Sequence, residues 1–332
     1  MKPRIIHKLV TIKKLVSNKL IDNGIYPDKR SPKLIIIMYH GIDKSENTTY
    51  NSRFFSVANF EKHIISLKKH FNILTYKDFL EDNYSTKKTN IVITFDDGYA
   101  NNFNYALPVL EKYNAHAFFF VTGVGTMEKK ILWADALDIV SHYAPANSKI
   151  TLNGVVFSFA GTKFVCDDTN TDLVAYIQAS NKPGYTEKEN LIEQLLNIYD
   201  FTKHKETGDY WELMNDEQIY KASLSNNITI GSHGFYHNNL GSLNNADAVN
   251  EVRLSKKYLE GIMQKEVGTI AFPDGSYTEQ LNESLEKEGF KKQFLVNYRF
   301  GDENKKKNIY DRFGLYPGMG NNHRIIYKIM NQ

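Results

Sequence analysis

The chain lacks several features that would by themselves decide its class. It holds a single cysteine, Cys166, among 332 residues, which excludes an internal disulfide framework and indicates a reducing compartment. No apolar stretch is long enough to cross a bilayer as a helix. Charge of one sign is not in excess either, because 41 Lys and Arg stand against 38 Asp and Glu. The charge balance therefore gives no reason to expect nucleic acid as a partner.

The N-terminal residues are basic but lack the continuous apolar core of a secretory signal peptide. Apolar side chains recur there at roughly helical spacing, with lysines between them. We expect a basic amphipathic helix within residues 1–30, which could contact an anionic membrane surface through residues 2–21. Packing against the main domain or a partner protein is the alternative. The expected location is cytoplasmic, with peripheral contact at the inner face of the membrane.

What the chain does have is a regular alternation of short apolar runs and helical patterns, which predicts βα units and a parallel sheet. The predicted strands are, in chain order, residues 34–38, 91–95, 117–121, 228–231, 269–272, 293–296 and 309–315. Seven such strands favour a closed or nearly closed α/β barrel over an open sheet.

The alternation is interrupted between residues 126 and 210. Asn153-Gly154 lies between two extended runs there, a pattern typical of a hairpin turn, and a helix is expected near residues 191–198. We therefore predict a barrel formed by residues 31–125 and 211–332, with residues 126–210 as a cap-like insertion.

Polar residues gather at the carboxyl ends of the predicted strands, where barrels of this kind carry their active sites. From the first strand to the fifth, the residues are His40, Asp96, Asp97, His233 and the turn Pro273-Asp274-Gly275, and Arg312 lies within the seventh strand. Several independent strands contribute to one rim, so the pattern indicates a functional site more strongly than any single motif.

The side chains on this rim suit metal-assisted hydrolysis. One carboxylate and the imidazoles of His233 and His237 can hold a catalytic zinc ion and leave room for water. The other carboxylate of the Asp96-Asp97 pair is then free to act as a base. The His-x-x-x-His spacing can place both rings on one face of a helical turn. Adjacent strand residues point to opposite sides, so the two aspartates do not suit the facing acid and base of a glycosidase.

The segments Thr94–Gly98 and Ser232–His237 resemble the T-F-D-D-G and H-[ST]-x-x-H motifs of the polysaccharide deacetylase family, carbohydrate esterase family 4, also called the NodB-homology domain. Gly234 occupies the Ser/Thr position of the second motif. Residues 271–277 resemble the third motif without its arginine. The resemblance implies a distorted (β/α)7 barrel, in agreement with the strand count.

The resemblance also implies roles for individual residues. It makes Asp96 the general base, and it makes Asp97, His233 and His237 the ligands of Zn²⁺ or another divalent transition metal. The usual Leu-x-His motif near the C-terminus is not evident. His40 resembles instead the acid of the circularly permuted branch that includes poly-N-acetylglucosamine deacetylases, with His323 as the alternative.

The remaining candidates for the site are less specific. Arg312 could replace the arginine missing from the third motif. Tyr99, Pro273, Asp274 and Gly275 are candidates for contacts with the substrate or with a reaction oxyanion. Trp133 and Trp211 flank the insertion and could stack on sugar rings, although packing in the core is the alternative.

Together these features predict a hydrolase that removes N-acetyl groups from an amino-sugar glycan or glycan precursor. The alternatives are a deformylase or amidase acting on a lipid-linked modified sugar, a catalytically inactive carbohydrate-binding barrel, and a membrane-bound adaptor. The carbohydrate substrate is the expected partner.

Overall fold

The structure is a computed structural model that describes residues 33–179, 183–296 and 308–332. The helix expected within residues 1–30, including the membrane contact at residues 2–21, lies outside the described residues. Within the described ranges, no helix has both the length and the apolar character that crossing a membrane requires.

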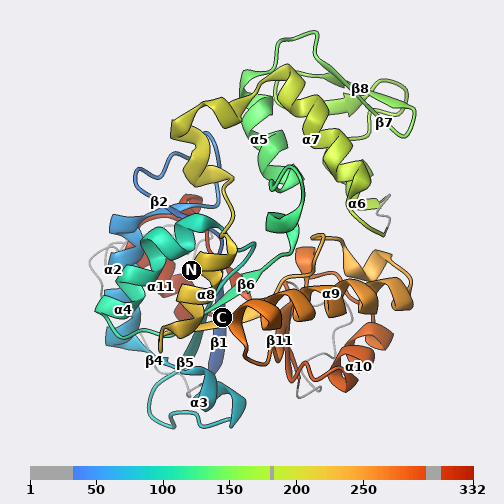
Figure 1. The fold of residues 1–332 in the computed structure, drawn as a ribbon. Coiled ribbons are helices and arrows are strands. Elements are labelled where there is room, and N and C mark those ends of the chain that lie inside the picture. The colour runs from blue at the N-terminus through green and yellow to red at the C-terminus, as the bar shows by residue number, and fades with distance from the viewer. Residues whose placement is uncertain (1–32, 180–182, 297–307) are drawn as a thin grey trace, which may run out of the picture.

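A curled parallel sheet forms the main body (Figure 1). Its strands are β1 (Leu34–Tyr39), β4 (Asn72–Ile73), β5 (Asn90–Phe95), β6 (Ala117–Val121), β10 (Ile228–Ser232), β11 (Thr269–Ala271), β12 (Lys292–Phe294), β13 (Ile309–Tyr310) and β14 (Phe313–Gly314). The strands follow the order β13-β12-β11-β10-β6-β5-β1-β14, and β4 pairs with β5. The first six predicted strands are all present, with ends that differ by at most two residues.

The two edges of this sheet are joined directly by the chain. β13 and β14 lie at opposite ends of the strand order, yet only Asp311 and Arg312 separate them. The chain covers at most about 10 Å over this interval, so the sheet must curl until its edges nearly meet. The expected single strand over residues 309–315 is therefore wrong, because the chain crosses the seam at Arg312. The α/β barrel-like fold itself is confirmed.

Alternate strand residues face the two sides of the curl. Ile36, Val92 and Phe118 belong to a buried cluster with Phe120 and Phe294. Their immediate neighbours along the strands pack instead with the surrounding helices. The same alternation continues at the carboxyl ends of β1 and β5, so the inward-facing positions there lead to the residues that form the site.

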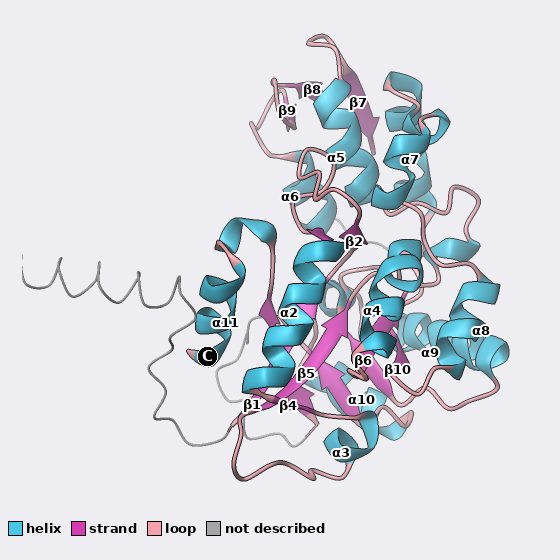
Figure 2. Cartoon of the chain, turned by 90° about the vertical axis from the view of Figure 1, so that its left-hand side faces the viewer, coloured by secondary structure: helices cyan, strands magenta, loops and turns pink. Residues whose placement is uncertain are grey.

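Helices cover the outer face of the sheet, and Figure 2 shows α2 and α4 lying across it. The helices of the main body are α2 (Val57–His70), α3 (Tyr76–Leu80), α4 (Leu107–Lys112), α8 (Asp216–Leu224), α9 (Asn245–Met263), α10 (Glu279–Lys287) and α11 (Asn322–Met330). A short parallel pair, β2 (Ile42–Asp43) and β3 (Phe55–Ser56), brackets a loop above the sheet.

The interrupted region forms a second body at the top of Figure 1. It contains α5 (Trp133–Tyr143), β7 (Lys149–Leu152), β8 (Val155–Phe159), β9 (Phe164–Cys166), α6 (Leu173–Ala179) and α7 (Thr186–Ile198). The predicted hairpin is confirmed, and both turn residues have positive φ, 53° at Asn153 and 79° at Gly154. This body has its own buried cluster, which includes Trp133. The boundaries at residues 126 and 210 stay predictions.

Candidate active site

Asp96 lies in the mouth of the curl and is held by Arg312. The guanidinium donates to both carboxylate oxygens, at 2.6 Å to Oδ1 and 2.7 Å to Oδ2. Arg312 also donates to the Leu295 carbonyl at 2.9 Å and to Thr94 Oγ1 at 3.3 Å. Both members of the ion pair are buried. Burial alone would raise the pKa of Asp96, but the charge and hydrogen bonds of Arg312 together with the neighbouring His233 and His40 outweigh burial and lower the pKa, so the carboxylate stays ionised.

Asp97 leaves the strand geometry and turns towards the histidines. Its φ is 75°, and Gly98 follows with φ 80°, a left-handed region that non-glycine residues seldom adopt. A Cβ at Gly98 would come within 2.9 Å of Val121 Cγ1, so the motif needs glycine there. The two neighbouring carboxylates therefore open onto one cavity with different surroundings, Asp96 beside an arginine and Asp97 beside two imidazoles.

The two histidines approach a single oxygen of Asp97. Nε2 of His233 lies 3.3 Å from Asp97 Oδ1, and Nε2 of His237 lies 3.2 Å from the same atom. His233 Nδ1 lies 2.8 Å from the Ala271 carbonyl oxygen. It must donate its hydrogen to that acceptor, so in the neutral ring the lone pair of Nε2 faces Asp97.

The pKa shifts in this group follow from the opposite charges. Burial alone would raise the pKa of Asp97, but hydrogen bonds from His233 and His237 hold it well below its usual value. Burial likewise opposes the charged form of His233, yet the neighbouring aspartates raise its pKa. The structure thus concentrates negative charge where two imidazoles converge. One ligand atom from each of the three residues lies within 4.8 Å of the other two, which is a donor set that zinc commonly takes.

The histidine loop is not the helical turn that the spacing suggested. Residues 233–239 form a loop in which Gly234 has φ 71° and His237 has φ 51°. A Cβ at Gly234 would point towards Glu251 Oε1 at 3.1 Å. The left-handed conformation favours glycine, which accounts for glycine in the position where the family motif has Ser or Thr.

Two buried charged residues fix this loop from behind, and the sequence did not reveal them as part of the site. Lys188, on α7 of the second body, donates to the carbonyls of Tyr236 at 3.0 Å and His237 at 2.7 Å, and to Asn238 Oδ1 at 2.6 Å. Glu251 on α9 accepts from the Tyr236 N–H at 3.0 Å and from Asn238 Nδ2 at 2.8 Å. The second body therefore helps to orient a candidate metal ligand.

Both residues left the same signal in the sequence, a charge on the buried face of a helix, which indicates a partner. Glu251 lies three residues after Ala248 and four before Ser255 on α9, and Lys188 lies three and four residues before Leu191 and Ile192 on α7. The pattern does not identify the partners, because the contacts of Lys188 lie 48 to 50 residues away.

Arg53 is a further charged residue that the sequence did not single out. Its Nη1 lies 3.7 Å from Asp97 Oδ2, and its Nη2 donates to Asp135 Oδ1 at 2.8 Å. Tyr99 donates to the Asp135 carboxylate at 2.8 Å, so its side chain supports Arg53 and does not line the cavity. Burial raises the pKa of Asp135 to about 8, while Arg53 acts in the opposite direction.

The two candidate acids lie in different places. His40 follows β1 and lines the same cavity as the aspartates. In the described part of the chain its Nδ1 is buried and makes no hydrogen bond. Burial lowers the pKa of His40 to about 4, and Arg53 acts in the same direction. His323 lies on α11, close enough to the last turn of α2 to affect the pKa of His70, and does not line the cavity.

The turn at residues 273–275 supplies another wall of the site. Asp274 lines the cavity with φ 54°. Gly275 donates its N–H to the Phe272 carbonyl at 2.9 Å, so this N–H already has an acceptor within the protein. A Cβ at Gly275 would come within 2.4 Å of the Val296 carbonyl oxygen, which makes its role one of close packing. Pro273, which lacks an N–H, lies near Gly234.

The cavity that these residues share has a volume of about 440 Å³. Its lining combines both aspartates of the motif with His40, His233, His237, Arg53, Asp274 and Trp133. Trp133 is buried and also packs in the core of the second body, whereas Trp211 is packed against that core and lies outside the cavity. A pocket of this size with convergent polar groups is typical of a small-molecule site.

The fold and this cavity define an α/β barrel with a candidate metal site at the carboxyl ends of its strands. A sequence model of the polysaccharide deacetylase family matches residues 83–150 and 188–292, just over half of the chain. The chain belongs to the polysaccharide deacetylase family. The matched residues contain both motifs and the turn at residues 273–275. They leave out three of the side chains described above, His40, Arg53 and Arg312.

Known proteins agree with this assignment. The chain is 34% identical over 113 residues to YxkH of Bacillus subtilis (strain 168), a protein named as a candidate polysaccharide deacetylase. That match covers 32% of this chain and 39% of the relative, so it spans well under half of the relative's length.

Solved structures share the fold at low sequence identity. The deacetylase PplD of Streptococcus pyogenes, solved in complex with acetate, has a TM-score of 0.53 at 16% identity, covering 91% of this chain and 99% of that chain. IcaB of Ammonifex degensii has a TM-score of 0.53 at 14% identity, covering 90% and 97%. At this level of identity the likeness supports the fold alone.

Proposed function

We propose that the protein is a metal-dependent hydrolase that removes N-acetyl groups from an amino-sugar glycan or glycan precursor. One observation carries the proposal. Asp97, His233 and His237 converge from two strand ends, and Asp96 lies beside them with its Oδ2 3.9 Å from His233 Nε2. A base next to a three-ligand site is the arrangement that metal-assisted hydrolysis requires.

The residues present fit a divalent cation. The bond from His233 Nδ1 to the Ala271 carbonyl leaves Nε2 as the free donor atom, which is how histidine ligands are usually oriented. Asp97, His233 and His237 would hold the ion. When bound, an ion such as Zn²⁺ lowers the pKa of its water to about 7 and polarises a carbonyl group.

Asp96 accepts the proton of the attacking water in this proposal. Arg312 occupies both carboxylate oxygens, and it keeps the group charged and fixes its orientation. Each oxygen still has a lone pair for the water, because a carboxylate can accept about four hydrogen bonds. The bidentate contact weakens Asp96 as a base, and in exchange it keeps the base ionised well below neutral pH.

His40 delivers a proton to the leaving nitrogen. Because burial lowers its pKa to about 4, the ring is neutral at rest, and the protonated form is a strong acid. In the proposed cycle, His40 becomes protonated only when negative charge develops on the substrate beside it. His40 takes this proton from water in the cavity, and Asp96 returns to water the proton it accepted, so both groups end the cycle as they began.

The developing oxyanion needs a hydrogen-bond donor in addition. Since the Gly275 N–H is engaged with Phe272, the backbone N–H of Asp274 is the candidate in this turn. Removal of one such donor typically costs about 3–4 kcal/mol in transition-state stabilisation. Action at the inner face of a membrane through residues 2–21 belongs to the same proposal and rests on the sequence alone.

The proposal is tested by acyl release from N-acetylglucosamine oligomers. The zinc-loaded full chain should release acetate, and treatment with a chelator should abolish the release until zinc is restored. Formate release from N-formyl oligomers with no acetate release would favour the deformylase instead. Release that persists without metal would contradict the mechanism.

A further inference from the structure

The two oxygens of the Asp97 carboxylate face different partners. Oδ1 lies 3.3 Å from Nε2 of His233 and 3.2 Å from Nε2 of His237, so it points to the candidate metal site. Oδ2 lies 3.7 Å from Nη1 of Arg53. The Asp97 side chain is only 4% exposed, so water screens its ion pairs weakly. One oxygen is therefore directed at the histidines and the other at a fixed positive charge.

Arg53 is anchored by residues other than Asp97. Its Nη2 donates to Asp135 Oδ1 at 2.8 Å and to the Tyr99 hydroxyl at 3.3 Å, and its Nε donates to Asn51 Oδ1 at 3.2 Å. Within the described residues, Nη1 is the guanidinium nitrogen that makes no hydrogen bond. Because the donors of a guanidinium form a rigid planar fork, the anchoring of Nη2 and Nε also fixes the direction of Nη1, towards Asp97.

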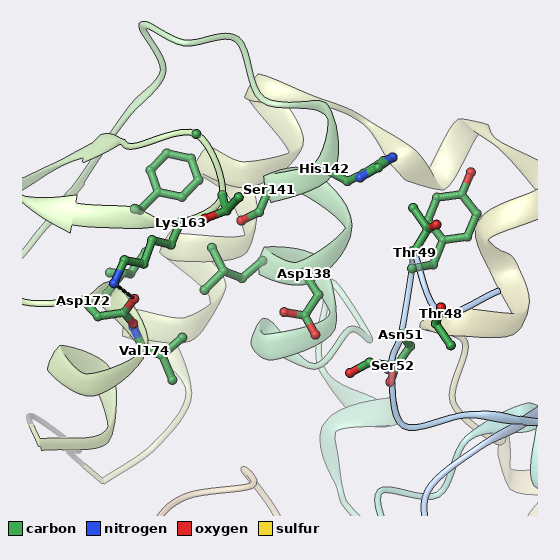
Figure 3. Close-up of a pocket in the computed structure, with 16 residues that line it drawn as sticks. Thr48, Thr49, Asn51, Ser52, Asp138, Ser141, His142, Lys163, Asp172 and Val174 are labelled. Carbon is green, nitrogen blue, oxygen red and sulfur yellow. Dashed lines mark hydrogen bonds and ion pairs between the residues drawn. The ribbon is translucent and has the colours of Figure 1, made fainter. Parts of the chain in front are cut away.

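The main anchor, Asp135, belongs to the second body. It lies in the first turn of α5 and its side chain is 1% exposed. Besides Arg53, it accepts hydrogen bonds from the Tyr99 hydroxyl at 2.8 Å and from Asn51 Nδ2 at 3.1 Å. Figure 3 shows the loop that precedes Arg53, with Asn51 labelled, beside α5, where the two segments line a cavity of about 370 Å³. The second body therefore sets where the Arg53 charge lies.

We propose that Arg53 is a positioning residue, anchored by Asp135, that attracts Oδ2 of Asp97 and leaves this carboxylate a single oxygen, Oδ1, for the metal. The inference rests on the proposed function for the presence of the ion. A carboxylate with both oxygens free can bind a cation through both, and the second oxygen would then compete with the attacking water for its place. Arg53 also offsets part of the Asp97 charge, which leaves a bound ion the stronger Lewis acid.

The test separates the fork of Arg53 from its charge. Arg53→Lys keeps the charge, but a single ammonium cannot span two carboxylates, and we expect it to stay with the more deeply buried Asp135. The double variant Arg53→Met/Asp135→Asn removes the pair without leaving a buried charge alone, so it provides a second variant if Arg53→Lys does not fold. Arg253→Lys is the matched control, because Arg253 donates to both carboxylate oxygens of Glu288 in an exposed pair.

Crystal structures of the zinc-loaded proteins give the distance from each Asp97 oxygen to the ion. In the wild type and Arg253→Lys, we expect Oδ1 at about 2.0–2.2 Å and Oδ2 beyond bonding distance, beside Arg53. In both Arg53 variants, we expect both oxygens on the ion. Calorimetry should then show zinc affinity unchanged or higher, whereas kcat/KM for acetate release should fall about 10–100-fold. The metal geometry is the deciding measurement, because Arg53 also lowers the pKa of His40 and activity alone would not separate the two effects.

The outcomes distinguish this inference from the proposed function. Binding through both oxygens in the wild type, or through Oδ1 alone in both Arg53 variants, would overturn the inference and leave the metal site standing. Zinc affinity that falls together with the melting temperature would make Arg53 a structural bridge and also overturn it. If zinc binds at Asp97 and no probe releases acetate, the proposed activity fails, and the two oxygen distances still decide the inference. A wild type without zinc at Asp97 would overturn both.

Discussion

The ion pair between Arg312 and Asp96 allows the assigned base to be tested through its titration. Arg312→Gln removes the positive charge and both hydrogen bonds, which measure 2.6 and 2.7 Å, while keeping a polar side chain in the seam. Within the described residues, Arg312 makes no hydrogen bond or ion pair with the candidate metal ligands Asp97, His233 and His237. The variant should therefore bind zinc like the wild type, and most of the change in catalysis should come from Asp96, since Arg312 is the smallest of the causes that act on the pKa of His40.

The expected magnitudes follow from burial. The Arg312 side chain is 0% exposed and that of Asp96 5%, so little water can screen the charge that is left. Breaking such a pair from one side typically costs about 3–5 kcal/mol of stability. The positive charge beside Asp96 lowers its pKa. Its removal should raise the pKa of Asp96, and the acid limb of the kcat/KM profile should move to higher pH.

The chain provides a matched control on its surface. Arg253 donates to both carboxylate oxygens of Glu288, at 3.0 and 2.6 Å, but its side chain is 55% exposed. Arg253→Gln should change stability little, because water screens this exposed pair, and it should leave the pH profile unchanged. The double variant Asp96→Asn/Arg312→Gln should recover part of the stability lost in Arg312→Gln, because no buried charge is then left without a partner.

The assay is kcat/KM for acetate release between pH 4 and 9, at equal zinc content, with unfolding by denaturant measured in parallel. An acid limb at the same pH in Arg312→Gln and Arg253→Gln would refute the assignment of Asp96 as the base whose charge Arg312 maintains. Loss of zinc from Arg312→Gln would show that the arginine acts on the metal site instead.

Two further predictions concern residues around the site. Lys188→Met should weaken zinc binding about 10–100-fold, because it removes three hydrogen bonds behind His237. Lys221→Met, at an exposed ion pair with Glu217, is the control and should leave zinc binding unchanged. Calorimetry measures the zinc affinity of both variants, and a lower melting temperature of Lys188→Met with unaltered zinc affinity would contradict a positioning role. His40→Ala should keep zinc and lose about 10²–10⁴-fold in kcat, whereas His323→Ala should retain nearly full activity; the reverse pattern in initial-rate measurements would move the acid to His323.

Much of the fold could be predicted from local patterns. The strand β6 is a continuous apolar run, and β5 is apolar except at Asn90 and Thr94, because both faces of each strand are buried; such runs are typical of parallel sheets. The Asn153-Gly154 turn requires positive φ at both positions, and that requirement is visible in the residue types. The split of residues 309–315 could not be predicted, because it results from closure of the sheet across its seam.

The candidate site was predictable only in part. The motif residues end strands, so their place on one rim follows from the topology of a parallel sheet. The supporting charges come from distant segments with no spacing in common. Arg312 was a candidate from the sequence, but its pairing with Asp96, 216 residues away, was not predicted. Arg53, 82 residues from its partner Asp135, was not singled out at all. Contacts of this kind depend on how the whole chain packs, and neither periodicity nor a local motif encodes them.

The central claim is that Asp97, His233 and His237 share one divalent cation beside Asp96. Anomalous diffraction at the zinc edge, from crystals of the zinc-loaded protein, tests it most directly. We expect one strong peak at about 2.0–2.2 Å from a carboxylate oxygen of Asp97 and from one nitrogen of each histidine. No peak at these three side chains, or a peak held by other residues, would contradict the account.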